Sequence, residues 1–401
     1  MLARTAPLRR ELEATLPARP FSLAFWDGTR LGSTTGDGPT FHVRSPEALA
    51  HALRAPGQLG IGRAYVSGEL DVDDLDAAID VLDGWRAPPL DGMARARLAL
   101  AAARACGLRP PPPVPRAELR PRGRRHSRER DARAVRHHYD LPAEFFALFL
   151  DESMTYSCAL FSRGATTLEE AQEAKLELVC AKLGLQAGDR VLDVGCGWGS
   201  FPIHAATRHD ARVLGITLSE PQAAFARRRV AELGLSDRVE IRVADYRALD
   251  EPHFDAVASI GMMEHVGSSR IDLYARRLAR LVRPGGRVLN HGIARLRHGE
   301  PEAGPFSERY VFPDAAPLHL SRVLLALERA GLVADHVEGF REDYATTLAH
   351  WLTRLDERLE EAVRLAGPER VRVWRLYLRA ARNGFRNGFT SVYQVRCGRP
   401  G

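Results

Sequence analysis

The sequence predicts an α/β protein whose larger domain is a doubly wound, seven-stranded sheet covered by helices. Two observations predict it. Short apolar runs alternate with helical patterns from about residue 136 onward, and a glycine-rich turn, Gly195 to Gly199, joins the first of these strands to the next helix. The first hundred residues lack this regular alternation, and their pattern predicts a smaller α+β domain at the N-terminus.

Composition narrows the class of protein only broadly. The 401 residues carry a net charge of +6, which favours anionic partners such as nucleic acid, acidic lipid headgroups or acidic substrates. The five cysteines are odd in number and no two have CxxC spacing, which argues against a disulfide framework or a zinc site, so no metal is expected. No apolar run reaches about 18 residues and the N-terminus has no apolar signal core, so we expect a cytoplasmic protein without a membrane span.

Residues 1–109 form the predicted N-terminal accessory domain. Strand-like runs at 21–26 and 40–43 are bounded by turn signals, and helical patterns follow at 46–54 and 73–83. No cluster of catalytic residue types occurs in this part of the sequence.

A proline- and arginine-rich linker is predicted for residues 110–135. The run PPPPVP at 110–115 favours an extended polyproline conformation, and nine arginines follow between Arg116 and Arg136. These arginines fit either a solvated linker or a surface for the anionic headgroups of a membrane. Nucleic acid binding is disfavoured because no aromatic platform accompanies them.

The catalytic domain is predicted from residue 136 to residue 401. Thr167 and Glu170 form a capping box for a helix that runs to about residue 183, ahead of the first strand at 191–194. Further strands are expected at 212–217, 239–243, 254–260, 287–293, 332–340 and 391–396. Helices are expected at 199–209, 220–233, 270–281, 317–330, 344–362 and 369–382, with a Pro-Gly-Gly turn at 284–286.

The segment Asp193-Val194-Gly195-Cys196-Gly197-Trp198-Gly199 resembles the first motif of class I S-adenosylmethionine methyltransferases, which have a Rossmann-like sheet. Glycines let the backbone approach a ligand closely, and Asp193 with the loop amides suits the zwitterionic methionine part of the cofactor. A polar segment, Thr217 to Gln222, stands where a ribose-binding acid is usual, and Asp245-Tyr246 is placed for the adenine edge. The predicted cofactor-binding residues are Tyr156, Ser157, Asp193, Gly195, Gly197, Gly199, Thr217, Leu218, Ser219, Gln222, Asp245, Tyr246 and Ile260.

Several longer runs match one branch of these enzymes. They are Tyr139-Asp140-Leu141, Thr155 to Ala159, Thr167 to Gln172 with Lys175, Asp193 to Gly199, Gly215 to Ser219 with Gln222, Ser259 to Gly261, Glu264 to Gly267, His291 to Ile293, Tyr310 to Pro313 and Tyr344 to Leu348. This set resembles the cyclopropane-fatty-acyl-phospholipid synthases, a family that includes the mycolic acid cyclopropane synthases. The resemblance covers about residues 139–396, and Gly60 to Asp73 also resembles the accessory domain of bacterial phospholipid-acting members.

The resemblance implies methyl transfer from S-adenosylmethionine to the double bond of an unsaturated phospholipid acyl chain, at the anionic inner face of the cell membrane. A homodimer is one arrangement that we consider. A bound bicarbonate ion is implied as the base that removes a proton so that the cyclopropane ring closes. The residues implied for this catalytic site are Cys158, Glu264, His291, Ile293 through its main chain, and Tyr344. Taken singly, each also fits a structural role, such as a buried cysteine or a strand-end histidine.

Two positions depart from the family pattern. Asn290 and Gly292 stand where an apolar residue and a threonine are expected, and we expect both to affect the substrate side of the pocket. They leave open a fatty acyl methyltransferase that forms a methylene branch instead of a ring. A small-molecule N- or C-methyltransferase is a third alternative, whereas a lipid carrier is disfavoured because it needs no cofactor turn.

Overall fold

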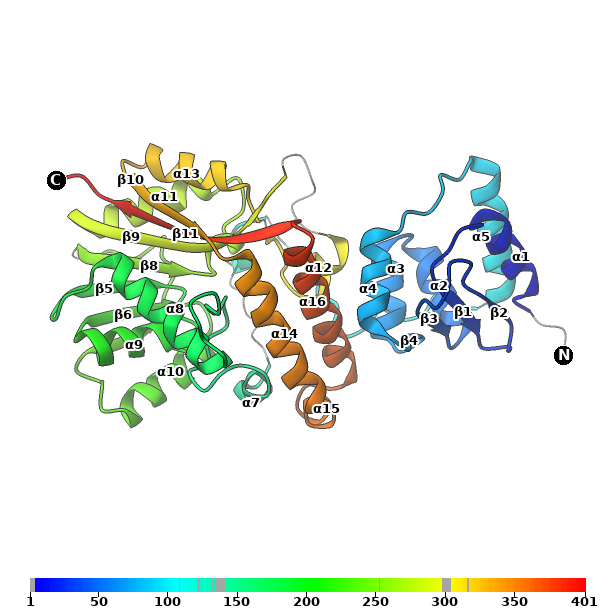
Figure 1. Cartoon of the computed structure of the whole chain (residues 1–401), viewed down its shortest axis with the longest axis horizontal. Helices are drawn as coiled ribbons and strands as arrows, with labels where there is room; N and C mark the ends of the chain where they lie inside the picture. Colours follow the sequence, from blue (N-terminus) through cyan, green and yellow to red (C-terminus); the bar gives the residue numbers. More distant parts are fainter. Residues whose placement is uncertain are drawn as a thin grey trace. The chain divides into compact units, whose positions relative to one another are not determined.

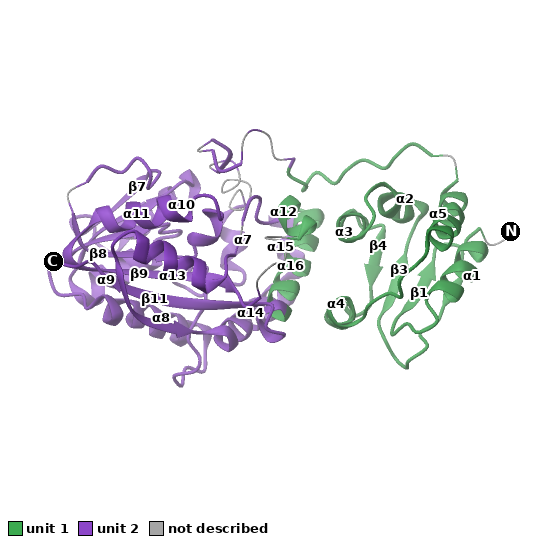
Figure 2. Ribbon diagram, turned by 90° about the horizontal axis from the view of Figure 1, so that it is seen from above, with its two compact units in different colours: residues 1–119, 304–310, 367–383 green, residues 120–303, 311–366, 384–401 purple. Residues whose placement is uncertain are grey.

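The computed structural model describes residues 4–107, 109–120, 123, 125–127, 129–131, 133, 141–251, 253–297, 304–315 and 317–401. They form two compact units, shown in different colours in Figure 2. Unit 1 comprises residues 1–119, 304–310 and 367–383, and unit 2 comprises residues 120–303, 311–366 and 384–401. These boundaries differ from the predicted order of accessory domain, linker and catalytic domain, because two later segments of the chain join unit 1.

Unit 1 contains a small mixed sheet with the strand order β2-β1-β3-β4. β1 (Ser22–Phe25) pairs antiparallel with β2 (Arg30–Leu31) and parallel with β3 (Thr40–Val43), and β3 pairs antiparallel with β4 (Leu70–Val72). Its helices include α1 (Ala6–Thr15), α2 (Pro46–Arg54), α3 (Gln58–Val66), α4 (Leu75–Gly84) and α5 (Gly92–Cys106). The sequence predicts α2 and α4 but misses α1, α3 and α5. The pattern of α3 is interrupted by Gly60 and Gly62, and that of α5 by the exposed apolar residues Met93 and Leu100.

The later segments in unit 1 are α12 (Pro305–Tyr310) and most of α16 (Pro368–Arg386). Buried Glu118 accepts hydrogen bonds from Nε and Nη2 of Arg63, both at 2.7 Å, and from the hydroxyl of Tyr310 in α12 at 3.0 Å. Arg379 of α16 donates to Asp76 of α4 at 3.1 Å. A carboxylate removed from water needs such partners, so these bonds tie the later segments to the first 119 residues.

Unit 2 is built on a sheet whose described strands have the order β10-β11-β9-β8-β5-β6-β7 (Figure 1). The parallel strands are β5 (Arg190–Val194), β6 (Arg212–Thr217), β7 (Val239–Val243), β8 (Phe254–Ile260) and β9 (Val282–Arg295). β11 (Thr390–Gly398) lies antiparallel between β9 and β10 (Val333–Gly339). The predicted α/β class with a seven-stranded sheet is therefore confirmed for the described residues.

Helices cover both faces of this sheet because side chains alternate along its strands. Val191 and Val213 pack with α8 (Leu168–Leu183) and α9 (Ser200–His209) on one face. Leu192 and Leu214 pack with α11 (Ile271–Leu281) and α13 (Leu320–Arg329) on the other. The remaining helices are α7 (Ala143–Ala147), α10 (Glu220–Glu232), α14 (Arg341–Glu357), α15 (Leu359–Ala366) and the short 3₁₀ helix η1 (Met263–His265).

Local boundaries agree with the sequence except at two places. The capping box at Thr167 and Glu170 is present at the start of α8. The expected turn at 284–286 lies instead inside β9, where the pairing with β8 shifts register and Gly285 has φ +74°. The expected helix at 344–362 is two helices, because Arg358 leaves helical geometry and its side chain bonds the carbonyl of Leu148 at 3.4 Å. None of the described helices combines the length and the apolar character needed to cross a bilayer.

Candidate active site

A large pocket in unit 2 opens at the carboxyl ends of β5, β6 and β8, where doubly wound sheets bind their ligands. Together with the space open to solvent, it measures about 1310 Å³. Most of the predicted cofactor residues line it, namely Tyr156, Ser157, Asp193, Gly195, Gly197, Thr217, Leu218, Gln222, Asp245, Tyr246 and Ile260. Gly199 and Ser219 lie outside the lining.

The glycine turn gives the pocket its floor. Gly195, Gly197 and Gly199 have φ values of +92°, +52° and +89°, a region that side chains disfavour. The amides of Gly195 and Cys196 both donate to the carbonyl of Ile216 at 2.9 Å, which fixes the turn against β6. A Cβ at Gly199 would lie 3.0 Å from Cβ of Ala226, so this glycine serves close packing of α9 against α10.

Ser219 likewise has a supporting place. It precedes α10, and its hydroxyl accepts from the amide of Gln222 at 3.4 Å. The hydroxyl of Thr217 donates to Oε1 of Gln222 at 3.0 Å, so the two pocket residues hold each other in position. The polar segment predicted in place of a ribose-binding acid is thus a preformed hydrogen-bonded loop.

Two buried groups of opposite charge face the pocket. Asp193, at the end of β5, has a pKa raised to about 7 by burial, and its Oδ1 has no hydrogen-bond partner among the described residues. Lys175, in α8, has a pKa lowered to about 8 by burial, and its Nζ donates to the hydroxyl of Ser157 at 2.7 Å. Within the described chain, Lys175 makes no ion pair with a carboxylate. The two groups are complementary to an ammonium and a carboxylate, the two charges of an amino acid.

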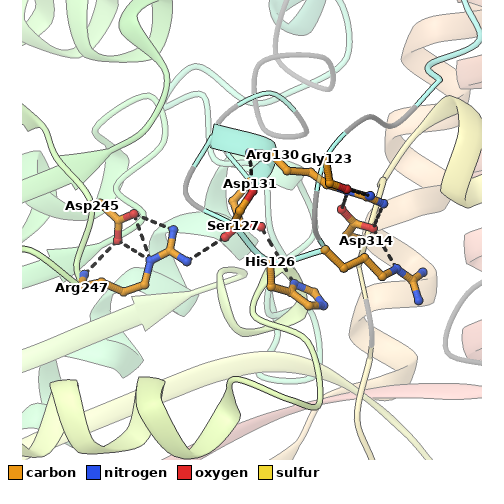
Figure 3. A network of polar contacts seen from close by, with 9 residues as sticks. Gly123, His126, Ser127, Arg130, Asp131, Asp245, Arg247 and Asp314 are labelled. Carbon is orange, nitrogen blue, oxygen red and sulfur yellow. Dashed lines mark hydrogen bonds and ion pairs between the residues drawn. The ribbon is translucent and has the colours of Figure 1, made fainter.

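Charged residues from several segments form a network of polar contacts (Figure 3), and four of them, Asp131, Asp245, Arg247 and Asp314, line the pocket. Asp245 accepts from Nε and Nη2 of Arg247 at 2.9 and 2.6 Å, and Nη1 of Arg247 reaches Asp131 at 2.9 Å. Arg130 binds Asp314 at 2.6 Å. The Arg130 side chain, predicted to be solvated or to face lipid, is therefore ion-paired inside unit 2, and the Asp245 carboxylate predicted for adenine is already bound by Arg247.

A second group of polar atoms gathers around β9. Oε1 of Glu264, in η1, accepts from the main-chain amide of Ile293 at 2.7 Å, whereas its Oε2 has no partner among the described residues. Burial raises the pKa of Glu264 to about 7. His291 and Cys158 line one narrow gap together with Lys175, Phe340 and Gln394. Lys175 thus borders both this gap and the large pocket.

The protonated nitrogen of His291 is set by a chain of hydrogen bonds. Nζ of Lys182 donates to Oε1 of Gln394 at 2.6 Å. Because a lysine can only donate, this contact fixes which end of the Gln394 amide is the oxygen. Nε2 of Gln394 therefore donates to Nδ1 of His291 at 3.2 Å. Burial lowers the pKa of His291 to about 3, so the ring is neutral and carries its proton on Nε2. That N–H has no acceptor within the part of the chain that is described.

Cys158 and Tyr344 show no reactive chemistry of their own. The thiol of Cys158 donates to the carbonyl of Ala159 at 3.2 Å, and burial raises its pKa well above its usual value. The ring centroid of Tyr344 lies 4.6 Å from that of Phe385, and Tyr344 lines neither the large pocket nor the narrow gap. The matched Tyr139 and Asp140 fall outside the described residues.

The two departures from the family pattern also lie outside the pocket lining. Oδ1 of Asn290 accepts from the hydroxyl of Tyr274 at 2.7 Å, so this buried amide is paired with a helix on the far side of the strand. A Cβ at Gly292 would meet Cε of Met263 at 2.8 Å, so the methionine fills the space of a larger residue. Neither residue lines the large pocket, and their effect on the substrate side stays a prediction.

Sequence reasoning assigned no role to Lys175, Lys182 or Gln394. The signal for the lysines is their spacing, because both fall at seven-residue intervals from Leu168 on the buried face of α8. A lysine at a buried helical position needs a partner or a ligand. Gln394 has no such signal, since its contact with His291 depends on the pairing of β11 with β9.

The sheet order, the glycine turn and Asp193 at the end of β5 define a class I S-adenosylmethionine-dependent methyltransferase. Residues 126–395 match the family described as mycolic acid cyclopropane synthetase, and the chain belongs to this family. It is 37% identical to a probable fatty acid methyltransferase of Pseudomonas putida, covering all of this chain and 96% of that one. It is 32% identical to the cyclopropane-fatty-acyl-phospholipid synthase of Escherichia coli, covering 91% and 88% of the two chains.

Solved structures agree with the family. The mycolic acid cyclopropane synthase CmaA1, complexed with SAH and CTAB, has a TM-score of 0.63 and is 34% identical, covering 66% of this chain and 97% of that one. A relative that carries SAH, the demethylated form of the cofactor, supports S-adenosylmethionine as the ligand of the large pocket.

Proposed function

We propose that this chain transfers the methyl carbon of S-adenosylmethionine to the cis double bond of a membrane phospholipid acyl chain and closes a cyclopropane ring. The observation that carries the proposal is that two buried polar atoms, Glu264 Oε2 and His291 Nε2, each have no hydrogen-bond partner among the described residues of unit 2. A carbocation formed at the double bond must lose a proton before water reaches it. A dry base site meets that requirement.

Asp193 and Lys175 would hold the two charges of the methionine part of the cofactor, and the glycine turn allows its close approach. When bound, S-adenosylmethionine supplies an electrophilic methyl group on a positively charged sulfur. Tyr156, whose ring stacks on Trp351 at 5.2 Å and which lines the pocket, offers a π face toward positive charge.

Bicarbonate would complement the two polar atoms left without partners around β9. Where Glu264 is ionised, its Oε2 would accept a hydrogen bond from the bicarbonate hydroxyl, and a bicarbonate oxygen would accept one from Nε2–H of His291. Bound there, it supplies a base. Glu264 would orient the ion, because its other oxygen is already fixed by the amide of Ile293. Cys158 and Tyr344 would then shape and dry the surroundings.

A fatty acyl methyltransferase that forms a methylene branch is the second candidate. It is favoured by the similarity, along the whole chain, to the Pseudomonas putida relative, which carries the name of a fatty acid methyltransferase. Both reactions add one carbon and two hydrogens, so the products differ in unsaturation and not in mass.

Contact with an anionic membrane belongs to the same proposal and has support in unit 1. On α5, Met93 and Leu100 are 70% and 52% exposed, and Arg97 and Arg104 lie on the same helical face by their spacing. Exposed apolar residues flanked by arginines suit a helix that lies in the headgroup region of an anionic bilayer.

Mass spectrometry of phospholipid fatty acids tests the function. The purified protein is incubated with S-adenosylmethionine and vesicles that contain oleoyl chains. A saturated product heavier by one CH₂, with ring fragmentation, supports the synthase. An olefinic product of that mass supports the methylene-branching alternative. Turnover of small amines with no change in the lipid would refute both.

A further inference from the structure

A cluster of metal-binding side chains lies between α8 and α9, away from the methyl-transfer residues. Cys180 on α8 and His204 and His209 on α9 offer one sulfur and two ring nitrogens, all within 4.8 Å of one another. Glu177, one helical turn before Cys180, contacts Nε2 of His204 at 3.2 Å and Nε2 of His209 at 3.0 Å through Oε2. We propose that these four residues form a binding site for zinc or a similar transition-metal ion.

The geometry is close to that of a metal site. In a triangle with sides of 4.8 Å the centre lies about 2.8 Å from each corner, whereas zinc binds nitrogen and sulfur at about 2.0–2.3 Å. Inward shifts of roughly 0.5–0.8 Å therefore bring all three atoms to bonding distance. Oε2 of Glu177 lies 3.2 and 3.0 Å from the ring nitrogens of the two histidines and would be the fourth ligand.

The chemical state of the ligands also suits a metal. The side chain of His204 is only 9% exposed, and its ring is held in position by Glu177. The buried thiol of Cys180 makes no hydrogen bond within the described residues, and a bound metal displaces the proton of such a thiol. The side chains of Glu177 and His209 are 51% and 20% exposed, so an ion reaches the cluster from solvent.

The search for CxxC spacing could not reveal this site, because two of its ligands come from α8 and two from α9. Glu177 and Cys180 are three residues apart on α8, and His204 and His209 are five apart at the end of α9. A metal would cross-link these helices. Because α8 carries Lys175 and α9 follows the glycine turn, the cross-link would stiffen the frame of the cofactor pocket.

Cobalt binding to the full-length, reduced and chelator-treated protein tests the site. We expect one Co²⁺ per chain, tetrahedral visible bands, an ultraviolet thiolate-to-cobalt charge-transfer band, and displacement by Zn²⁺. Cys180→Ser removes the charge-transfer band. The surface variant His209→Gln weakens zinc binding by more than about 100-fold, since even groups outside the coordination sphere contribute 10- to 100-fold.

Cys106→Ser, a buried cysteine in unit 1, is the matched control and leaves the spectrum unchanged. Thermal unfolding gives an independent readout. Zn²⁺ should raise the unfolding temperature of the wild type and of the Cys106→Ser control but not that of His209→Gln. No charge-transfer band in the wild type, or the same band in Cys180→Ser, would overturn the proposal. Neither result depends on methyltransferase activity.

Discussion

Replacing Lys175 with methionine should change the stability of the ligand-free protein and its cofactor affinity in opposite senses. Lys175 is 2% exposed, and its pKa is lowered from 10.5 to about 8 by burial. At neutral pH the lysine is charged in both the folded and the unfolded chain, so the folded state bears a cost of roughly 3 kcal/mol. That cost disappears as the pH rises from about 8 toward 10.5, because the folded protein then loses its proton first.

Lys175→Met removes this cost and fills a similar volume, so the free energy of unfolding of the ligand-free protein should rise by up to roughly 3 kcal/mol at pH 7. The loss of the hydrogen bond to Ser157 reduces the gain. Affinity for S-adenosylhomocysteine should fall roughly 10- to 100-fold, the effect of losing a hydrogen bond from a charged group, about 1.5–3 kcal/mol.

Denaturant unfolding and titration calorimetry measure the two quantities. Lys182→Met is the matched control on the same helix, because Lys182 has an anionic partner, Glu338, at 2.6 Å. This variant should lose stability and keep its affinity for S-adenosylhomocysteine. The reasoning about Lys175 is refuted if its methionine variant binds S-adenosylhomocysteine within about twofold of the wild type.

Three further predictions concern different parts of the chain. Gln394→Leu should lower kcat at least about tenfold and leave the affinity for S-adenosylhomocysteine unchanged, because the His291 ring is then no longer held with its proton on Nε2. A kcat equal to that of the wild type in steady-state assays would contradict this. The affinity of the wild type for S-adenosylhomocysteine should fall as the pH drops below about 7, because the pKa of Asp193 is raised to about 7 and its carboxylate then becomes protonated. Titration calorimetry of Asp193→Asn should show no such fall. Met93→Glu with Leu100→Glu should abolish sedimentation with anionic vesicles at low salt but leave circular dichroism unchanged; sedimentation equal to that of the wild type would remove α5 from the account.

Local signals made much of unit 2 predictable. The capping box at Thr167 fixed the start of α8, and the bounds of β6 and β8 follow from short apolar runs. The glycine turn located the cofactor pocket because positive φ values restrict such positions to glycine. These features depend on residues that are neighbours in the chain, which is why they are visible in the sequence.

Features that depend on distant pairing were not predictable. The contact of Gln394 with His291 requires the register of β11 on β9, which no local pattern encodes. The assignment of α12 to unit 1 depends on Glu118 meeting Tyr310 across 192 residues, and that of α16 on Arg379 meeting Asp76. The ion pair of Arg130 with Asp314 is of the same kind, so an arginine-rich segment that looked solvated contains a buried contact.

The central claim is that the added methyl carbon loses one proton to a base bound in the active site. Its most direct test uses S-adenosylmethionine with a trideuterated methyl group, vesicles with oleoyl chains, and mass spectrometry of the product. The account predicts a saturated, ring-containing acyl chain that retains two deuterium atoms. A product that retains all three would contradict deprotonation of the methyl group, and unlabelled lipid would contradict methyl transfer to the acyl chain.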